Sequence, residues 1–283
     1  VFSGILAAEE TPAVEFLTGV EYANPEETHL GMNIALPKAT GARRPAVLCI
    51  HGGGFRAGKR DSYDVLCKQL AARGYVAATA SYRLAPMYKF PKAIYDVKAA
   101  VRFLRLNADK YQIDPDRIGV VGGSAGGHLV QTLGVTEGVE QFEGDQNPGA
   151  SSKVACVVNY YGPSDFTKSY GKSVDAHEVL PLWFGGDLST HRHLHQVGSP
   201  LNWVTPMAAP TLIIHGTEDK YVAFEQAEWM VARYQQVGAD VELLKLEGAG
   251  HGFKGEDAAK AEAAMFMFFD KHLKSDGPKP GSR

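Results

Sequence analysis

The chain has 283 residues, of which 45% are hydrophobic and 22% are charged, and its formal net charge is -3. These values are typical of soluble globular proteins, because a disordered chain has fewer apolar residues and a membrane-spanning helix needs about 18 of them in a row. The 29 basic and 32 acidic residues nearly balance, which argues against a surface for nucleic acid or anionic lipid. We therefore expect a small, neutral ligand.

The two ends and the cysteines say little about function. The stretch Leu6-Ala7-Ala8 fits the cleavage end of a signal peptide, which would make the protein secreted or periplasmic, and a cytoplasmic protein is the alternative. The segment 275–283 contains turn-forming and charged residues and is predicted to be a disordered tail. Cys49, Cys67 and Cys156 show neither a disulfide framework nor a metal-binding spacing, so we interpret them as small buried hydrophobic side chains.

Short apolar runs alternate with segments of helical periodicity from residue 46 onward, which predicts βαβ units on a mostly parallel sheet with helices on both faces. Two earlier runs, 15–22 and 28–36, are joined by turn-forming residues and should pair antiparallel at one edge of the sheet. The six later strands are expected at 46–51, 75–82, 118–122, 154–161, 210–215 and 241–247. The sequence thus predicts an eight-stranded α/β fold.

Periodic spacing predicts the helices between these strands, and one long connection lacks it. Helices are expected at 62–74, 94–104, 224–238 and 256–274. Residues 162–205 are rich in aromatic residues, glycine, proline and histidine, and show no long periodic helix. Because connections of this length are usually functional, we expect a short lid or substrate-binding insertion within one domain spanning residues 1–274.

The first chemical motif is Gly122-Gly123-Ser124-Ala125-Gly126, which fits G-x-S-x-G. The pattern alone is weak in a chain with 31 glycines, but here a predicted strand precedes it and a predicted helix follows it. A sharp strand-to-helix turn exposes the serine hydroxyl, and side chains at the flanking glycines would collide with neighbouring backbone. Ser124 is therefore the predicted nucleophile.

The second motif is His51-Gly52-Gly53-Gly54-Phe55, directly after a predicted strand. Successive glycine amides can point at one spot, as the oxyanion of an acyl-transfer reaction requires. We expect the amides of Gly53, Gly54 and Ala125 to form this oxyanion hole. A phosphate-binding loop is the alternative, but its following Lys-Ser/Thr pair and the G-x-G-x-x-G spacing are absent.

An activated serine needs a base, and the base needs an orienting carboxylate. His251 follows the last predicted strand, and Asp219 follows the strand before it, so both side chains should emerge at the same sheet edge as Ser124. Glu218 is an alternative orienting group, although it lies one residue closer to the strand. Asp165, at the end of a different strand, is either a backup acid or a loop cap.

Other histidines carry competing interpretations. His191, His193 and His195 would face one way on an extended segment and could then bind a metal, but no cysteine or carboxylate pair completes a site, so an exposed lid surface is expected. His128 and His215 are interpreted as packing or structural residues. We predict no metal.

Together these motifs resemble the α/β-hydrolase esterases of the hormone-sensitive-lipase-like type, especially the bacterial branch with feruloyl and acetyl-xylan esterases. The resemblance covers about residues 28–274 and includes Ser81-Tyr82-Arg83-Leu84-Ala85-Pro86 and Asp114-Pro115-Asp116-Arg117-Ile118 as well. It implies a cofactor-free serine hydrolase with Ser124 as nucleophile, His251 as base and Asp219 as orienting acid. The long amphipathic N-terminal cap of lipases is missing.

These residues predict a serine carboxylesterase that forms an acyl-enzyme intermediate on short-acyl or hydroxycinnamoyl esters, including carbohydrate-linked ones. Phe55, Tyr161, Trp183 and Trp203 are candidate substrate-binding residues, because rings can stack on a sugar or aromatic acyl group. Alternatively, such rings form the core of the insertion itself. An amidase, arylformamidase or peptidase with the same triad is a second possible function, and an inactive binding module is a third. The sequence does not indicate an oligomeric state.

Overall fold

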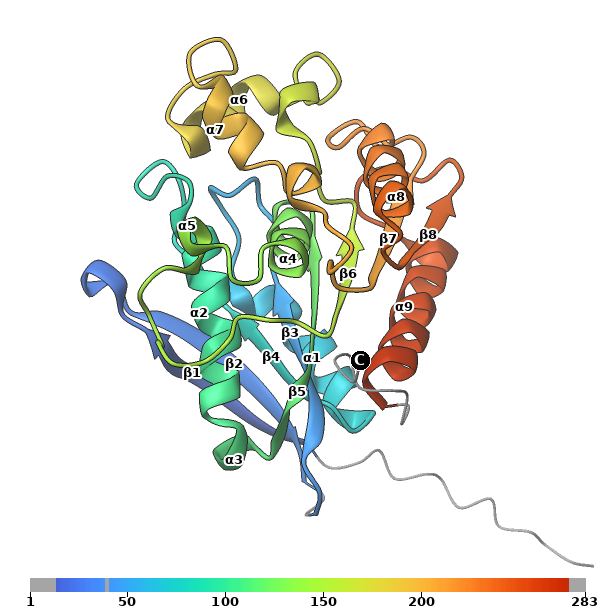
Figure 1. Ribbon diagram of the computed structural model, residues 1–283. Coiled ribbons are helices and arrows are strands. Elements are labelled where there is room, and N and C mark those ends of the chain that lie inside the picture. Colours follow the sequence, from blue (N-terminus) through green and yellow to red (C-terminus); the bar gives the residue numbers. More distant parts are fainter. Residues whose placement is uncertain (1–13, 39–40, 275–283) are drawn as a thin grey trace, which may run out of the picture.

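A computed structural model describes residues 14–38 and 41–274, and its centre is one eight-stranded sheet in the order β1-β2-β4-β3-β5-β6-β7-β8 (Figure 1). β1 and β2 form an antiparallel pair, β2 is antiparallel to β4, and the remaining neighbours are parallel. The strands are β1 (Val14–Ala23), β2 (Leu30–Pro37), β3 (Arg44–Ile50), β4 (Val76–Ala80), β5 (Ile113–Gly123), β6 (Cys156–Tyr160), β7 (Thr211–Gly216) and β8 (Val241–Leu246). This is the fold that the sequence predicts.

β5 begins five residues before the predicted boundary. Its first residues, Ile113 to Arg117, are mostly polar, and the register against β3 shifts between Arg44 and Ala46. Because this end of the strand is partly exposed, it lacks the continuous apolar run by which a strand covered on both faces is recognised.

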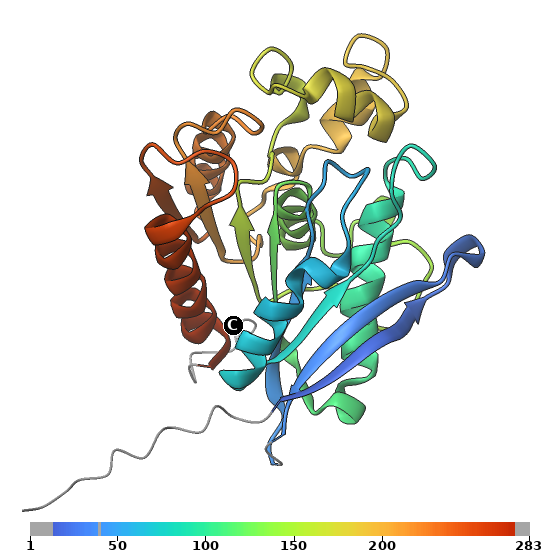
Figure 2. The same ribbon diagram turned by 180° about the vertical axis from the view of Figure 1, so that it is seen from behind.

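Helices cover both faces of the sheet (Figures 1 and 2). On one face, the apolar sides of α1 and α9 pack in a common core over the sheet. On the other face, α2 and α4 pack over the centre, and α8 packs against β7. The helices are α1 (Asp64–Ala72), α2 (Lys92–Leu106), α3 (Ala108–Tyr111), α4 (Ala125–Val135), α5 (Glu140–Glu143), α8 (Glu225–Val237) and α9 (Gly255–Phe269), which continues as a π-helical turn over Asp270–Lys274.

The predicted insertion lies above the carboxyl ends of the strands (Figure 1). It contains two short α-helices, α6 (Ala176–Phe184) and α7 (Arg192–Val197). The amide of Val174 donates to the carbonyl of Lys220 (3.0 Å), and the amide of Phe90 donates to that of Trp183 (2.8 Å). These bonds join the insertion to the loop after β7 and to the segment before α2. Its expected role as a lid stays a prediction.

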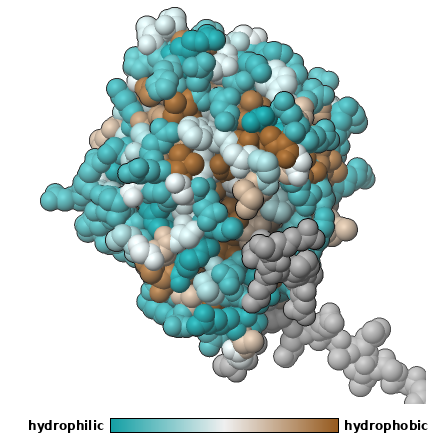
Figure 3. Space-filling model, viewed as in Figure 1, coloured by the Kyte–Doolittle hydropathy of each residue, from teal (hydrophilic) through white to brown (hydrophobic). Residues whose placement is uncertain are grey.

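The described surface is largely hydrophilic on the side shown, with hydrophobic residues in small groups (Figure 3). No helix within residues 14–38 and 41–274 is long and apolar enough to cross a membrane. The possible signal-peptide end and the expected disordered tail lie outside the described residues.

Candidate active site

Ser124 sits on the sharp turn between β5 and α4. Its backbone has φ 56° and ψ −121°, a conformation that side-chain-bearing residues rarely adopt. A Cβ on Gly122 would lie 2.4 Å from the carbonyl oxygen of Gly126, and a Cβ on Gly126 would lie 2.1 Å from that of Ile50. The turn can therefore form only with glycine at both flanks, which is the steric requirement expected of G-x-S-x-G.

The glycine loop after β3 lies beside this turn. Gly53 and Gly54 have φ angles of 116° and 59°, and a Cβ on Gly53 would lie 2.2 Å from the carbonyl oxygen of Ala57. Arg56 and Ala57 both donate their amides to the Gly53 carbonyl, which closes the loop. Among the described residues, the amides of Gly53 and Gly54 have no backbone acceptor of their own. They are free to bind an anionic oxygen.

His251 and Asp219 meet at the carboxyl edge of β7 and β8. His251 Nδ1 lies 2.7 Å from Asp219 Oδ2, while Asp219 Oδ1 accepts the amides of Tyr221 and Val222, each at 2.9 Å. Burial by itself would raise the pKa of Asp219, but hydrogen bonds from His215, His251 and the Val222 amide outweigh it and hold this pKa well below its usual range. An ionised Asp219 requires His251 Nδ1 to carry its proton, which leaves Nε2 as the basic nitrogen.

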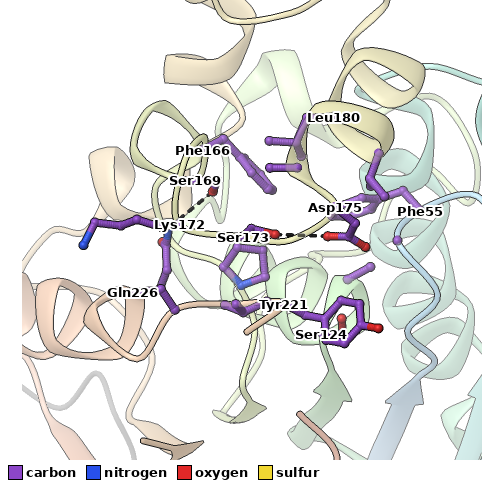
Figure 4. Close-up of a pocket in the computed structure, with 17 residues that line it drawn as sticks. Phe55, Ser124, Phe166, Ser169, Lys172, Ser173, Asp175, Leu180, Tyr221 and Gln226 are labelled. Atoms are coloured by element: carbon purple, nitrogen blue, oxygen red, sulfur yellow. Dashed lines mark hydrogen bonds between the residues drawn. The ribbon is translucent and has the colours of Figure 1, made fainter. Parts of the chain in front are cut away.

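Ser124 borders two cavities. The outer cavity, of about 460 Å³, contains Ser124 and His251 in its lining, together with the glycine loop. The inner cavity, of about 70 Å³, is lined by Ser124 and Ala125 but not by His251 (Figure 4). Gly54, Ser124, Asp175, Val179 and Tyr221 line both. The structure therefore brings the six predicted triad and oxyanion residues together at Ser124. His251, the predicted base, lines only the outer cavity.

Two of the four candidate substrate-binding residues line these cavities. Phe55 lines the inner cavity and Tyr161 the outer one, with the Tyr161 ring 4.5 Å from that of His251. Burial, and then the Asp219 carboxylate, raise the pKa of Tyr161, so its hydroxyl remains a hydrogen-bond donor at neutral pH.

Trp183 and Trp203 line neither cavity. The expected substrate contact is wrong for Trp183, which has no exposed surface, and that of Trp203 stays a prediction. Trp183 is fully buried and stacks on Phe55 with a centroid distance of 3.8 Å. The Trp203 indole donates to the carbonyl of Val197, and its ring packs edge-on against Phe142. Both rings pack in the apolar core of the insertion and the helices beneath it, Trp183 as a buried member and Trp203 as a partly buried one.

The histidines of the insertion do not form a metal site. They lie at the start of α7 and within it, where residues two apart point to different faces. No cluster of three metal-binding side chains exists among the residues that the structure describes. The expected exposed surface is wrong for His195, which is fully buried, with Nε2 2.9 Å from the Tyr170 hydroxyl.

Three further polar residues lie outside the predicted triad, and two of them support loops near the sheet edge. Glu218 is exposed, and its amide bonds to Ala249, whereas Asp219 points to His251. Asp165 accepts the Thr167 amide at 2.9 Å and acts as a loop cap. His215 Nε2 lies 2.8 Å from the Val222 carbonyl and 3.5 Å from Asp219, so it supports the loop that holds the acid.

Sequence reasoning missed the side chains that shape the cavities. Asp175, Val179 and Leu180 come from α6 and the residue before it, and Tyr221 comes from the loop that carries Asp219. No motif marks the first three, since the folded insertion alone brings them to Ser124. Tyr221 lies two residues after the predicted acid, and that proximity was the one available signal.

Known proteins are similar to this chain in sequence and in fold. The BD-FAE family model matches residues 32–234. Esterase LipC of Mycobacterium tuberculosis (strain ATCC 25618 / H37Rv) is 36% identical over 76% of this chain and 55% of LipC. Ethyl acetate hydrolase of Pseudomonas putida is 44% identical over 78% of this chain and 70% of that protein. The chain spans about half the length of the Mycobacterium tuberculosis relatives that it matches.

A solved structure covers more of the chain. The truncated form of a carbohydrate esterase from gut microbiota aligns with a TM-score of 0.83 at 28% identity, over 95% of this chain and 99% of that one. The likeness therefore includes the insertion as well as the sheet.

Proposed function

The chain belongs to the BD-FAE family of α/β-hydrolase esterases, and we propose that it is a serine carboxylesterase acting on short-acyl esters, including carbohydrate-linked ones. The observation that carries the proposal is the 2.7 Å contact between His251 and a buried, ionised Asp219, at a cavity that also contains Ser124 and the glycine loop. The similarity to an ethyl acetate hydrolase supports the short acyl group, and the similarity to a carbohydrate esterase supports the carbohydrate-linked alcohol.

In the proposed mechanism, Ser124 Oγ attacks the ester carbonyl while His251 Nε2 takes the hydroxyl proton. The carbonyl oxygen becomes an oxyanion and accepts hydrogen bonds from the amides of Gly53, Gly54 and Ala125. As the C–O bond to the alcohol breaks, His251 returns the proton to the leaving oxygen, and the acyl group remains on Ser124. Water, deprotonated by the same nitrogen, then releases the acid and restores the serine.

The position of His251 supports a proposal for where the two halves of the substrate bind. The leaving oxygen must take its proton from His251, which lines the outer cavity alone, so the alcohol occupies that cavity and the acyl group the inner one. At about 70 Å³, the inner cavity has less than half the volume of an engineered core cavity of roughly 150 Å³ that binds benzene. This favours acetyl and similarly small groups over hydroxycinnamoyl groups.

The test compares Ser124→Ala with the unchanged protein. We expect p-nitrophenyl acetate hydrolysis to fall by about a million-fold and labelling by a fluorophosphonate to disappear, with an unchanged melting temperature. Retained hydrolysis, or a fluorophosphonate adduct elsewhere, would contradict the assignment. Methyl ferulate, acetylated xylan and N-formylkynurenine should be compared on the unchanged protein, and a higher kcat/KM for ferulate than for acetate esters would refute the short-acyl preference.

A further inference from the structure

Asp175 stands at the residue before α6, where an aspartate usually caps the helix. Its main-chain carbonyl accepts the amides of Glu178 and Val179, which begin the helix. Its side chain accepts no helix amide, although an aspartate at this position normally bonds to the second or third amide of the helix. Its Oδ1 instead accepts the Ser173 hydroxyl at 3.0 Å. The carboxylate is thus not used to stabilise the helix.

The same carboxylate reaches the junction of the two cavities. Asp175 lines both of them, as does Ser124, and Figure 4 shows it beside Phe55 with the Ser173 bond on one side. The Lys172 side chain extends away from the pocket (Figure 4) and pairs with Glu225. Arg56, which lines the outer cavity, pairs with Glu178 at 2.5 Å. Within the described part of the chain, no basic side chain forms an ion pair with Asp175.

Aromatic side chains line the outer cavity together with this acid. They are Tyr63, Tyr161 and Tyr221, and Tyr221 is half exposed. Aromatic faces cover the apolar C–H faces of a sugar ring, and a carboxylate oxygen accepts hydrogen bonds from its hydroxyls. A carboxylate without a cation repels an anionic group in the same cavity.

We propose that Asp175 is a specificity-determining residue for the alcohol half of the substrate. Its carboxylate binds a hydroxyl of a polyhydroxylated leaving group in the outer cavity and disfavours negatively charged leaving groups. The inference rests on the proposed esterase function, since it assigns the leaving group to the cavity that contains His251. Asp175 takes no proton and makes no bond in the reaction itself.

The experiment uses two acetate esters of equal ring size, a monoacetate of methyl xyloside and cyclohexyl acetate. Asp175→Ala removes the acceptor, so we expect kcat/KM for the sugar acetate to fall about ten- to a hundredfold, mainly through KM, because one hydrogen bond to a charged group is lost. The values for cyclohexyl acetate and p-nitrophenyl acetate should stay within about threefold. Asp187→Asn is the matched control, because it removes a charge from the same insertion but lines neither cavity.

The proposal would be overturned if Asp175→Ala left the ratio of kcat/KM for the sugar acetate to that for cyclohexyl acetate unchanged, whether both values fell equally or neither fell. A loss on acetylcholine larger than that on the sugar acetate would overturn it too, because the acid would then recognise a cationic alcohol. If the unchanged protein hydrolyses neither cyclohexyl nor p-nitrophenyl acetate, the esterase function itself fails, which is a separate result.

For a second variant we expect a gain in relative activity on an anionic ester, and misfolding cannot produce such a gain. Asp175→Asn removes the charge but keeps the size, so kcat/KM for 4-acetoxybenzoate relative to p-nitrophenyl acetate should rise about fivefold as a like-charge repulsion disappears. High salt should reduce this gain, since it screens the repulsion in the unchanged protein. A ratio that does not rise contradicts the proposed exclusion of anionic leaving groups.

Discussion

The carboxyl edge of the sheet and the insertion of residues 162–205 both line the cavities at Ser124, but different constraints act on them. At the sheet edge, backbone contacts leave no room for another residue type, as at Gly126, where an added Cβ would lie 2.1 Å from a carbonyl oxygen. In the insertion, side chains such as Leu180 reach the inner cavity because α6 packs on Phe55 and its neighbours. Changes at the edge should therefore affect every substrate, and changes in the insertion should discriminate among substrates.

Among changes that leave Ser124 in place, the largest effect is expected at Asp219, the proposed orienting acid. Asp219→Asn removes the charge that orients His251, so kcat should fall by about ten-thousandfold for all esters alike. Steady-state kinetics on acetate and butyrate esters would measure this. Glu218→Gln is the matched control, because this neighbouring carboxylate is exposed and should leave kcat within about twofold. A strong dependence of the Asp219→Asn loss on the acyl group would break the distinction between the two regions.

Acidification should destabilise α4 through His128, while Asp219, the proposed triad acid, stays charged. His128, in α4, is fully buried against Phe55 and Trp183, and burial lowers its pKa from 6.5 to about 4. The unfolded chain therefore binds a proton that the folded protein does not, and stability is lost as the pH falls from 6.5 towards 4. The loss amounts to about 3 kcal/mol. The pKa of Asp219 is also lowered, so its contribution disappears only below the ordinary carboxylate range.

Denaturant unfolding at several pH values would measure this loss. His128→Gln keeps a donor for the Gly198 carbonyl, which His128 Nε2 contacts at 2.7 Å, but it cannot titrate. The stability of the variant should depend less on pH between 6.5 and 4 by about the same 3 kcal/mol. Parallel pH profiles for the two proteins would show that His128 is not the group responsible.

A smaller, selective effect is expected in the inner cavity, where we propose that the acyl group binds. Leu180→Ala enlarges the inner cavity, so the ratio of kcat/KM for p-nitrophenyl hexanoate to that for the acetate should rise about tenfold. The same change should cost about 2 to 5 kcal/mol of stability, measured by denaturant unfolding, since it removes buried methyl groups. Leu182→Ala lies on the same helix but lines neither cavity, and its ratio should not change. If the hexanoate-to-acetate ratio were the same in Leu180→Ala and Leu182→Ala, the acyl group would not bind in the inner cavity.

The sequence predicted the sheet and its carboxyl edge well and the insertion poorly. The strands were predictable because buried parallel strands read as apolar runs, and the arrangement around Ser124 was predictable because tight turns leave glycine signatures. The place of Asp175 in the cavities was not predictable, because an aspartate before a helix is expected to cap it, and only the fold shows that this side chain accepts no helix amide. Trp183 was misassigned because aromatic composition alone does not distinguish a ring stacked on Phe55 from one offered to a ligand.

The separation of the two cavities also sets an order of product release in the proposed mechanism. After the first step the alcohol leaves from the wide, open outer cavity, while the acyl group stays in the narrow one. Water must then enter through the space that the alcohol has vacated. An added alcohol occupies that same space and competes with water for the acyl group, so the geometry that permits hydrolysis also permits transfer of the acyl group to a second alcohol.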